Sequence, residues 1–71
     1  MNTLRSRFGK RLRAIRRQKD LTQEQLAEAV GISIEFLSNL ERGVNAPSFE
    51  TLEKLADILQ VPVRDLFDFP E

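Results

Sequence analysis

The chain has 71 residues, 41% of them apolar, which suits one small domain, and it has no cysteine and no histidine. These absences exclude disulfides, cysteine-based metal sites and the commonest general base. The net charge is zero, but residues 1–19 carry eight cations and no acid (+8), whereas residues 20–71 carry three cations and eleven acids (3 − 11 = −8). Such segregation indicates a nucleic acid or an acidic partner, or else a solvated helix whose charges pair with acidic neighbours.

The first predicted helix spans about residues 3–19. Its apolar residues recur at spacings of four, four and three and form one stripe, with the arginines on the other faces: Leu4, Phe8, Leu12 and Ile15. Gly9 lowers helix stability relative to alanine, and we expect it to let a neighbouring backbone approach closely. Asp20 then stands where the chain needs a left-handed residue, a conformation that aspartate tolerates.

The second and third predicted helices span about residues 23–30 and 34–42. Thr22 begins the second helix with a capping box. Gly31 ends that helix, because the tight turn needs a left-handed conformation. Ser33 then caps the third helix.

The fourth predicted helix spans about residues 49–60 after a cap at Ser48, and a short fifth helix spans 62–67 with Pro62 in its first turn. The apolar stripe of the fourth helix consists of Phe49, Leu52, Leu55, Ala56 and Leu59. No stretch alternates apolar and polar residues for long enough to form a strand. We therefore predict an all-α fold in which residues 1–71 form a single domain of five helices around one core.

Two of these helices flank a tight turn within residues 23–42. Ala27 is small and faces inward, so the helices can cross closely, and Gly31 follows it by four residues. Leu37 comes six residues later, and Leu40 points to the same core. This pattern predicts a helix-turn-helix, in which the second helix lies in the major groove of DNA.

Three segments carry a family resemblance: RLRAIRRQKDLTQEQLAEAVGIS, FLSNLERGVNAPSFETLEKLADIL and VPVRDLF. In this order and at this spacing, from about Phe8 to Phe67, they resemble the phage-repressor-like, Cro-type helix-turn-helix domains called the XRE family. The resemblance implies a five-helix, lambda-repressor-like fold and a DNA-binding transcriptional regulator.

The resemblance also implies that Ile34, Glu35, Ser38 and Asn39 face the bases. Helix geometry supports this independently, because these positions lie away from the two inward leucines. Asn39 can pair with adenine N6 and N7, Ile34 can touch a thymine methyl, and Glu35 can accept from cytosine N4. Alternatively, Glu35 marks a domain that binds DNA only weakly. For Phe36 we expect core packing rather than a DNA contact.

Other positions match residues that contact the DNA backbone in the family. Gln23 matches a phosphate contact, although it can also be a simple polar residue at a helix start. Ser33 caps its helix, which is its safer role, and its hydroxyl or the nearby N–H groups can also bind a phosphate. A loop that grips the sugar-phosphate backbone matches Arg42 and the backbone N–H groups of Gly43, Val44 and Asn45.

Arg16 and Glu41 match a family pair that bridges the first and third helices. A partly buried pair would order the recognition helix more than it adds stability. An exposed pair would contribute less than about 1 kcal/mol.

We predict a sequence-specific double-stranded DNA-binding transcriptional regulator, a repressor, that acts as a homodimer and places residues 34–42 in the major groove. The loop GVNAP carries no cation, so a monomer should bind weakly and dimerisation should be needed. The candidate dimer contacts are Val63, Phe67 and Phe69; for Phe67 we favour packing on the core, and for Phe69 a partner. The alternative is a protein-interaction module, an antitoxin or co-regulator, that docks an acidic partner on the basic first helix.

Nothing in the sequence indicates an enzyme. It lacks a glycine-rich phosphate-binding loop as well as histidine and cysteine, so we expect no catalytic residue, cofactor, metal or small-molecule ligand. No apolar run approaches the roughly 18–20 residues of a membrane span, and the basic start lacks the apolar segment of a secretory signal. We expect a cytoplasmic protein of bacterial or phage type that acts on nucleoid DNA.

Overall fold

The computed structural model describes residues 2–70, which form four α-helices and one short 3-10 helix with no strand among them. The elements are α1 (Leu4–Gln18), α2 (Gln23–Val30), α3 (Ile34–Glu41), α4 (Phe49–Leu59) and η1 (Val63–Phe67). The predicted all-α class is confirmed. The predicted fifth helix is a 3-10 helix, and Pro62 precedes it as the N-cap instead of lying in its first turn. Residues 1 and 71 of the predicted domain lie outside the described residues.

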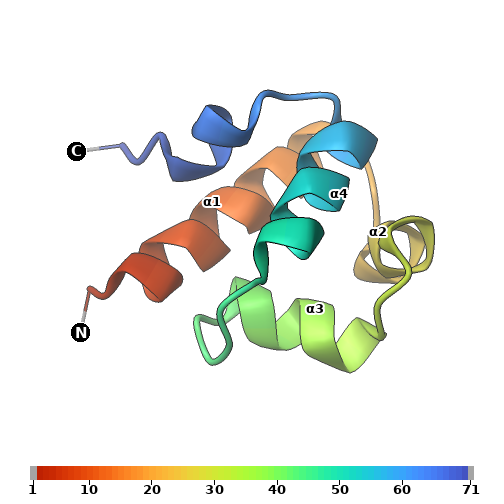
Figure 1. Ribbon diagram of the computed structural model, residues 1–71, viewed down its shortest axis with the longest axis horizontal. Coiled ribbons are helices and arrows are strands. Elements are labelled where there is room, and N and C mark those ends of the chain that lie inside the picture. Colours follow the sequence, from red (N-terminus) through yellow and green to blue (C-terminus); the bar gives the residue numbers. More distant parts are fainter. Residues whose placement is uncertain (1, 71) are drawn as a thin grey trace.

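The helices surround one core, and Figure 1 shows their arrangement. Helices α1 and α4 cross in the middle, α3 runs along the lower edge with α2 beside its right-hand end, and η1 lies along the upper edge. Both ends of the chain lie on the same side of the molecule. The core takes residues from all five elements: Phe8, Leu12, Ile15, Leu26, Ala27, Val30, Leu37, Leu40, Leu52, Leu55, Ala56, Leu59 and Leu66.

Each α-helix begins at a hydroxyl side chain. The N-caps are Thr3, Thr22, Ser33 and Ser48, and each hydroxyl accepts from the backbone N–H three residues later. At Thr22 the Gln25 side chain also accepts from the cap's own N–H, so the predicted capping box is confirmed. The caps satisfy N–H groups that a helix start otherwise leaves without a partner, which explains why the boundaries fall close to those predicted.

Left-handed residues occur at the turns. Gly31 has φ 86° and Asp20 has φ 58°, which confirms both predictions. Gln60, at φ 58°, is a left-handed cap that was not predicted. The expected helix extended to residue 60 because glutamine carries no turn signal.

Two residues assigned to apolar stripes are exposed. Leu4 is 55% exposed and Phe49 is 83% exposed, so the prediction that both face the core was wrong. Each is the first residue of its helix, and each lies about 70–80° from the centre of the buried face at 3.6 residues per turn. Since a helical Cβ tilts toward the N-terminus, both side chains project beyond the core.

Gly9 sets the distance between α1 and α3. A Cβ at this position would clash with the carbonyl oxygen of Leu40 and would lie 2.5 Å from that of Glu41. The predicted close approach of a neighbouring backbone is therefore confirmed. The absence of a side chain lets α3 rest directly on α1.

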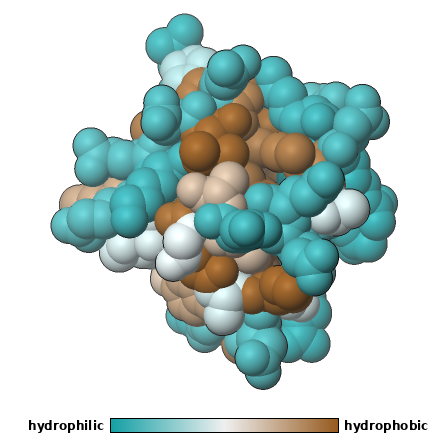
Figure 2. Space-filling model, turned by 90° about the vertical axis from the view of Figure 1, so that its right-hand side faces the viewer, coloured by the Kyte–Doolittle hydropathy of each residue, from teal (hydrophilic) through white to brown (hydrophobic). Residues whose placement is uncertain are grey.

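The core reaches the surface in places, as expected for so small a domain. Figure 2 shows the side that carries α2, where hydrophilic side chains cover most of the surface and hydrophobic atoms emerge between them. The partly buried apolar residues packed against the core are Leu21, Ile32, Phe36, Val61 and Phe67. Among the described residues, no helix combines the length and apolar character needed to span a membrane.

Candidate nucleic-acid interface

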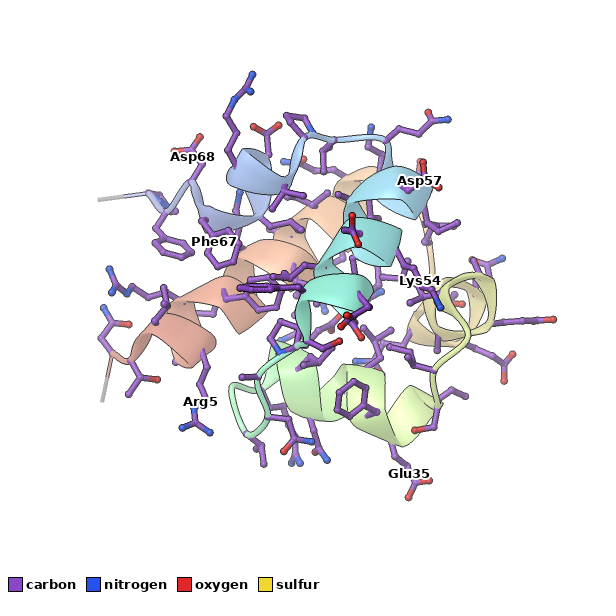
Figure 3. The ribbon with its side chains drawn as sticks, viewed as in Figure 1. Arg5, Glu35, Lys54, Asp57, Phe67 and Asp68 are labelled. Atoms are coloured by element: carbon purple, nitrogen blue, oxygen red, sulfur yellow. The ribbon has the colours of Figure 1, made fainter. Side chains whose placement is uncertain are left out.

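The outer face of α3 presents the four residues predicted to face bases. Leu37 and Leu40 are fully buried and fix the inward side of the helix. Ile34 and Glu35 are exposed, and the remaining two, Ser38 and Asn39, are partly exposed. Figure 3 shows the Glu35 side chain pointing away from the body of the protein on the lower side of α3. The predicted orientation of the helix is confirmed.

Phe36 lies between these two faces. It is partly buried and packs against the core cluster, so the expected core packing is confirmed. Its backbone N–H donates to the hydroxyl of Ser33 at 3.0 Å. The capping role of Ser33 is thereby confirmed, and one of the two lone pairs of its hydroxyl oxygen is used by the helix.

Asn39 has a defined amide orientation. The Nη2 of Arg42 donates to its Oδ1 at 2.6 Å. A guanidinium has donors and no acceptor, so the amide oxygen, and not the amide nitrogen, must face it. The NH₂ group of Asn39 is therefore directed elsewhere, and the second lone pair of its oxygen remains able to accept.

Arg16 and Glu41 form a bidentate ion pair between α1 and α3. Arg16 Nε donates to Glu41 Oε2 at 2.6 Å, and Nη2 donates to Oε1 at 3.1 Å. The two side chains are only 9% and 2% exposed. A third donor of the guanidinium, Nη1, reaches the carbonyl oxygen of Leu21 at 2.7 Å. The pair is buried, so of the two predicted alternatives the exposed pair is wrong; that the buried pair orders α3 more than it adds stability stays a prediction.

Gln23 belongs to the same network. Its Nε2 donates to Glu41 Oε1 at 3.0 Å, and the side chain is partly buried. The bond holds the first residue of α2 against the last residue of α3. The side chain keeps one amide hydrogen and its carbonyl oxygen for another partner.

The loop after α3 uses its own amides internally. The N–H of Gly43 donates to Leu40 O at 3.2 Å, and the N–H groups of Val44 and Asn45 donate to Asn39 O at 2.9 and 3.3 Å. The three amides predicted to grip phosphate thus complete the end of α3, and a phosphate would have to share them. Beside this loop, Arg5 Nη1 donates to Val44 O at 3.3 Å. It supplies a cation from α1 where the loop has none.

A concavity of about 690 Å³ opens between α1, α2 and α3. Its lining residues are Arg13, Arg16, Arg17, Thr22, Gln23, Glu24, Ile34, Ser38, Glu41 and Arg42. Three of them, Arg13, Arg17 and Arg42, are exposed cations. We call this surface the α1–α3 concavity. It combines predicted base-facing and backbone-facing residues with arginines from the first helix.

The turn between α2 and α3 has the expected geometry. Ala27 is 1% exposed, and its carbonyl oxygen accepts hydrogen bonds from the N–H groups of Gly31 and Ile32 at 2.9 and 3.0 Å. A Cβ at Gly31 would meet nothing within 4 Å. The glycine is therefore required by its backbone conformation and not by crowding.

The predicted dimer contacts differ in their surroundings. Val63 is exposed, whereas the ring of Phe67 packs on Phe8 with centroids 5.3 Å apart, which confirms core packing for Phe67. Figure 3 shows Phe67 between η1 and α1. The ring of Phe69 lies 6.2 Å from that of Phe67, and Arg7 stands 5.0 Å over its centroid. The chain itself thus covers part of Phe69.

The sequence profile of the helix-turn-helix family HTH_3 matches residues 12–66, which is most of the chain. The chain belongs to this helix-turn-helix family. The XRE resemblance is thereby confirmed, and the lambda-repressor-like fold agrees with the structural neighbours below.

The relatives of this helix-turn-helix chain include transcriptional regulators. It is 41% identical over 59 residues to the uncharacterized HTH-type transcriptional regulator YazB of Bacillus subtilis, covering 83% of this chain and 86% of YazB. The controller protein C.AhdI of Aeromonas hydrophila superimposes with a TM-score of 0.86 at 38% identity, over 89% of this chain and 96% of C.AhdI. The master regulator of biofilm formation SinR, solved in complex with DNA, gives 0.81 at 35% identity, over 86% of this chain and 98% of that structure.

Several relatives of this helix-turn-helix chain are longer. It covers 45% of the regulator DdrOP3 of Deinococcus deserti, 53% of the repressor RstR of Vibrio cholerae and 38% of the immunity repressor of Bacillus phage phi105.

Sequence reasoning did not single out Arg5, Arg13 and Arg17. They were counted only within the +8 charge of residues 1–19. Helical spacing could have placed Arg13 and Arg17 on one side, since they are four residues apart. Nothing in the sequence could show that α1 crosses α3 at the angle that directs them into the α1–α3 concavity.

Proposed function

We propose that the chain is a sequence-specific, double-stranded DNA-binding transcriptional regulator, a repressor, that acts as a homodimer and places α3 in the major groove. The observation that carries this proposal is the outer face of α3, which the buried Leu37 and Leu40 hold outward. The α1–α3 concavity lies beside this face and carries exposed arginines. Relatives named as regulators and repressors, and a neighbour solved with DNA, support the same function.

The outer residues of α3 would read base edges. Asn39 would pair with adenine, Ile34 would contact a thymine methyl, and Glu35 would accept from cytosine N4. Glu35 would also repel phosphates and so discriminate against non-specific DNA. Ser38 can donate or accept and would tolerate several bases.

The DNA backbone would be held around this helix. Gln23, anchored on Glu41, would donate its second amide hydrogen to a phosphate, and Ser33 would lie at the positive N-terminal end of α3. Arg42 and the arginines of α1 would contact neighbouring phosphates. The amides of Gly43, Val44 and Asn45 would contribute less than their positions imply, since each already has an acceptor.

A monomer offers a short reading helix and few phosphate contacts, so two copies would be needed. In a two-fold dimer the recognition helices would enter successive major grooves about 34 Å apart. The operator would then be an inverted repeat with half-sites about one helical turn apart.

The test is a selection from random DNA duplexes with the original chain, Asn39→Ala and Glu35→Ala. We expect the original chain to select an inverted repeat, and Asn39→Ala to lose about 1–3 kcal/mol of preference at one base pair per half-site. Glu35→Ala should bind random duplex more tightly and discriminate less. Asp57→Ala is the matched control, because Asp57 is an exposed acid of α4 that does not line the α1–α3 concavity (Figure 3).

Unchanged preferences in both variants would reject α3 as the reading surface. Absence of any affinity for random duplex at low salt would reject DNA binding itself. It would favour the alternative, a module that docks an acidic protein on the basic face of α1.

A further inference from the structure

Phe49 is the most exposed of the large hydrophobic residues that the structure describes. It is 83% exposed, whereas the next, Leu4, is 55% exposed. A phenyl ring contributes a large apolar area, roughly 150–250 Å² when buried. As the first residue of α4 it projects from the helix end without a covering element.

An apolar groove lies beside it. The groove has a volume of about 500 Å³, and its lining residues are Thr3, Leu4, Arg5, Phe8, Ala46, Pro47, Leu52 and Phe67. They come from the start of α1, the loop before α4, α4 itself and η1. Figure 1 shows these segments around one side of the molecule, the side on which both chain ends lie. We call it the α1–η1 groove.

The position of Phe49 suits a second copy of this chain. Phe49 follows Pro47 of the groove by two residues and Leu52 of the groove follows it by three, so the projecting ring and the groove are neighbours on one surface. The high exposure of Phe49 shows that it does not fill its own groove. A two-fold rotation that placed each ring at the groove of the other copy would make a closed, isologous contact.

The charges around the two features are complementary. Arg5 lines the groove, in the part of the chain that carries +8. The acids Glu50 and Glu53 flank Phe49 on α4, and Glu53 is four residues along, on the same side of the helix. Such a two-fold contact would bring the acidic start of each α4 to the basic start of the other α1.

We propose that this chain forms a two-fold dimer in which Phe49 of each copy inserts into the α1–η1 groove of the other. The proposal rests on the homodimer in the proposed function and names its contact. It moves the interface away from Phe69, which packs on its own chain, and centres it on residues at the starts of α1 and α4.

Sedimentation equilibrium of the full chain without DNA tests the contact. We expect a reversible monomer–dimer equilibrium and, for Phe49→Ala, a dimer Kd raised about 30-fold or more, because the symmetric interface loses two central aromatic residues. Ile58→Ala is the matched control: Ile58 is an exposed apolar residue of the same helix, 37% exposed, and should leave Kd within about twofold. Thermal melts of both variants at low concentration should match the original chain, since neither residue is in the core.

A charge exchange tests the orientation. Arg5→Glu alone should weaken the dimer, and Arg5→Glu combined with Glu53→Arg should restore at least part of the loss, because each dimer contains the pair twice. Arg5→Glu and Glu53→Arg are also measured singly, and a fold-increase in Kd for the double variant equal to the product of the two single fold-increases would overturn the proposed pairing.

Three results would overturn the proposal. The first is a strict monomer at the highest concentration reached, which would leave the groove to another occupant. The second is an unchanged Kd for Phe49→Ala. The third is dissociation by Phe69→Ala with no effect of Phe49→Ala.

Binding to random duplex at low salt separates failure of the dimer contact from failure of the proposed function. Phe49→Ala should keep the DNA affinity per protomer, whereas a chain that dimerises through Phe49 and binds no DNA would refute only the DNA function.

Discussion

In the proposed DNA complex, the bond between Arg42 and Asn39 would make recognition of one base depend on two residues. We predict that Arg42→Ala weakens the preference for one base pair, the same base pair that Asn39→Ala affects, by about 0.5–1 kcal/mol. The reason is that the Asn39 amide loses the donor that fixes its orientation. Arg42→Ala should also lower affinity for all sequences through a lost phosphate contact. Competition binding to duplexes altered one pair at a time measures both effects. Arg17→Ala is the control and should give only the uniform loss.

The double variant Arg42→Ala with Asn39→Ala tests whether Arg42 acts by orienting Asn39 or contributes independently. If Arg42 acts through Asn39, adding Arg42→Ala to Asn39→Ala should cost no further preference at that pair. If Arg42→Ala lowered affinity equally for all duplexes and kept the full preference at the base pair assigned to Asn39, the prediction would be contradicted. The sequence indicated that Asn39 faces outward, but it could not indicate this bond, since exposed side chains choose among several partners.

The left-handed residues offer a second prediction at this scale. Gln60→Gly should raise the free energy of unfolding by about 0.5–1 kcal/mol, because glycine adopts φ 58° without the steric cost that other residues pay. Asp20→Gly should give a smaller gain, since aspartate tolerates this conformation. Urea unfolding measures both, and Ala29→Gly, inside α2 and exposed, should lose about 1 kcal/mol as a control. A loss of stability in Gln60→Gly would contradict the assigned backbone conformation.

At the scale of the helices, the contact between α1 and α3 leaves no space for a side chain at Gly9. We predict that Gly9→Ala lowers the free energy of unfolding by about 2 kcal/mol or more, because the added methyl would press on backbone carbonyl oxygens of α3 that cannot turn aside. Helix propensity alone predicts the opposite, a gain of about 1 kcal/mol. Ala14→Gly, an exposed position of the same helix, should lose about 1 kcal/mol. A stabilised Gly9→Ala would show that the two helices can separate at little cost.

Replacing the ion pair between the same helices as a whole should affect DNA binding more than stability. Glu41→Leu should lower the free energy of unfolding by about 3–5 kcal/mol, since it leaves the Arg16 charge buried without its partner. Arg16→Met combined with Glu41→Leu should recover most of that loss. Urea unfolding measures these changes, and Glu28→Leu, at an exposed position of α2, should stay within about 0.5 kcal/mol.

DNA binding should not recover in the same way. In the double variant Gln23 loses the carboxylate that anchors it, so affinity for duplex should remain reduced although the fold is restored. Full recovery of both properties would mean that the pair only fills space.

The elements themselves were largely predictable, for local reasons. The hydroxyl caps and the apolar periodicity act within a few residues, so they fixed four helices to within one or two positions. The predicted burial of Leu4 and Phe49 was wrong because an apolar residue at the start of a helix can fit the apolar periodicity and still lie beyond the end of the core. The last element was expected as a helix, but five residues make few bonds, and the tighter 3-10 form is common in such short segments.

For the whole molecule, the charge segregation was compatible with a nucleic acid, an acidic partner or a solvated helix, and it did not define a binding surface. The first 19 residues carry +8, yet these cations point in several directions: Arg13 and Arg17 line the α1–α3 concavity, whereas Arg11 Nε donates to the carbonyl oxygen of Asp65 at 2.8 Å. Only the packing of α1 across α3 decides which arginines lie beside the outer face of α3. Charge counting therefore overstates the number of contacts available to one DNA duplex.

This distinction predicts the salt dependence of DNA binding. The slope of log affinity against log salt is about −0.9 per neutralised phosphate on B-DNA. Arg13→Gln and Arg17→Gln should each make the slope shallower by about 1 and weaken binding equally for specific and random duplexes, because phosphate contacts carry no sequence information. Arg64→Gln is the control: this exposed arginine of η1 lies in the 3-10 helix opposite α3 in Figure 1, and its slope should equal that of the original chain. If Arg64→Gln changed the slope as much as Arg17→Gln, DNA would lie on the opposite surface, and the α1–α3 concavity would lose its proposed role.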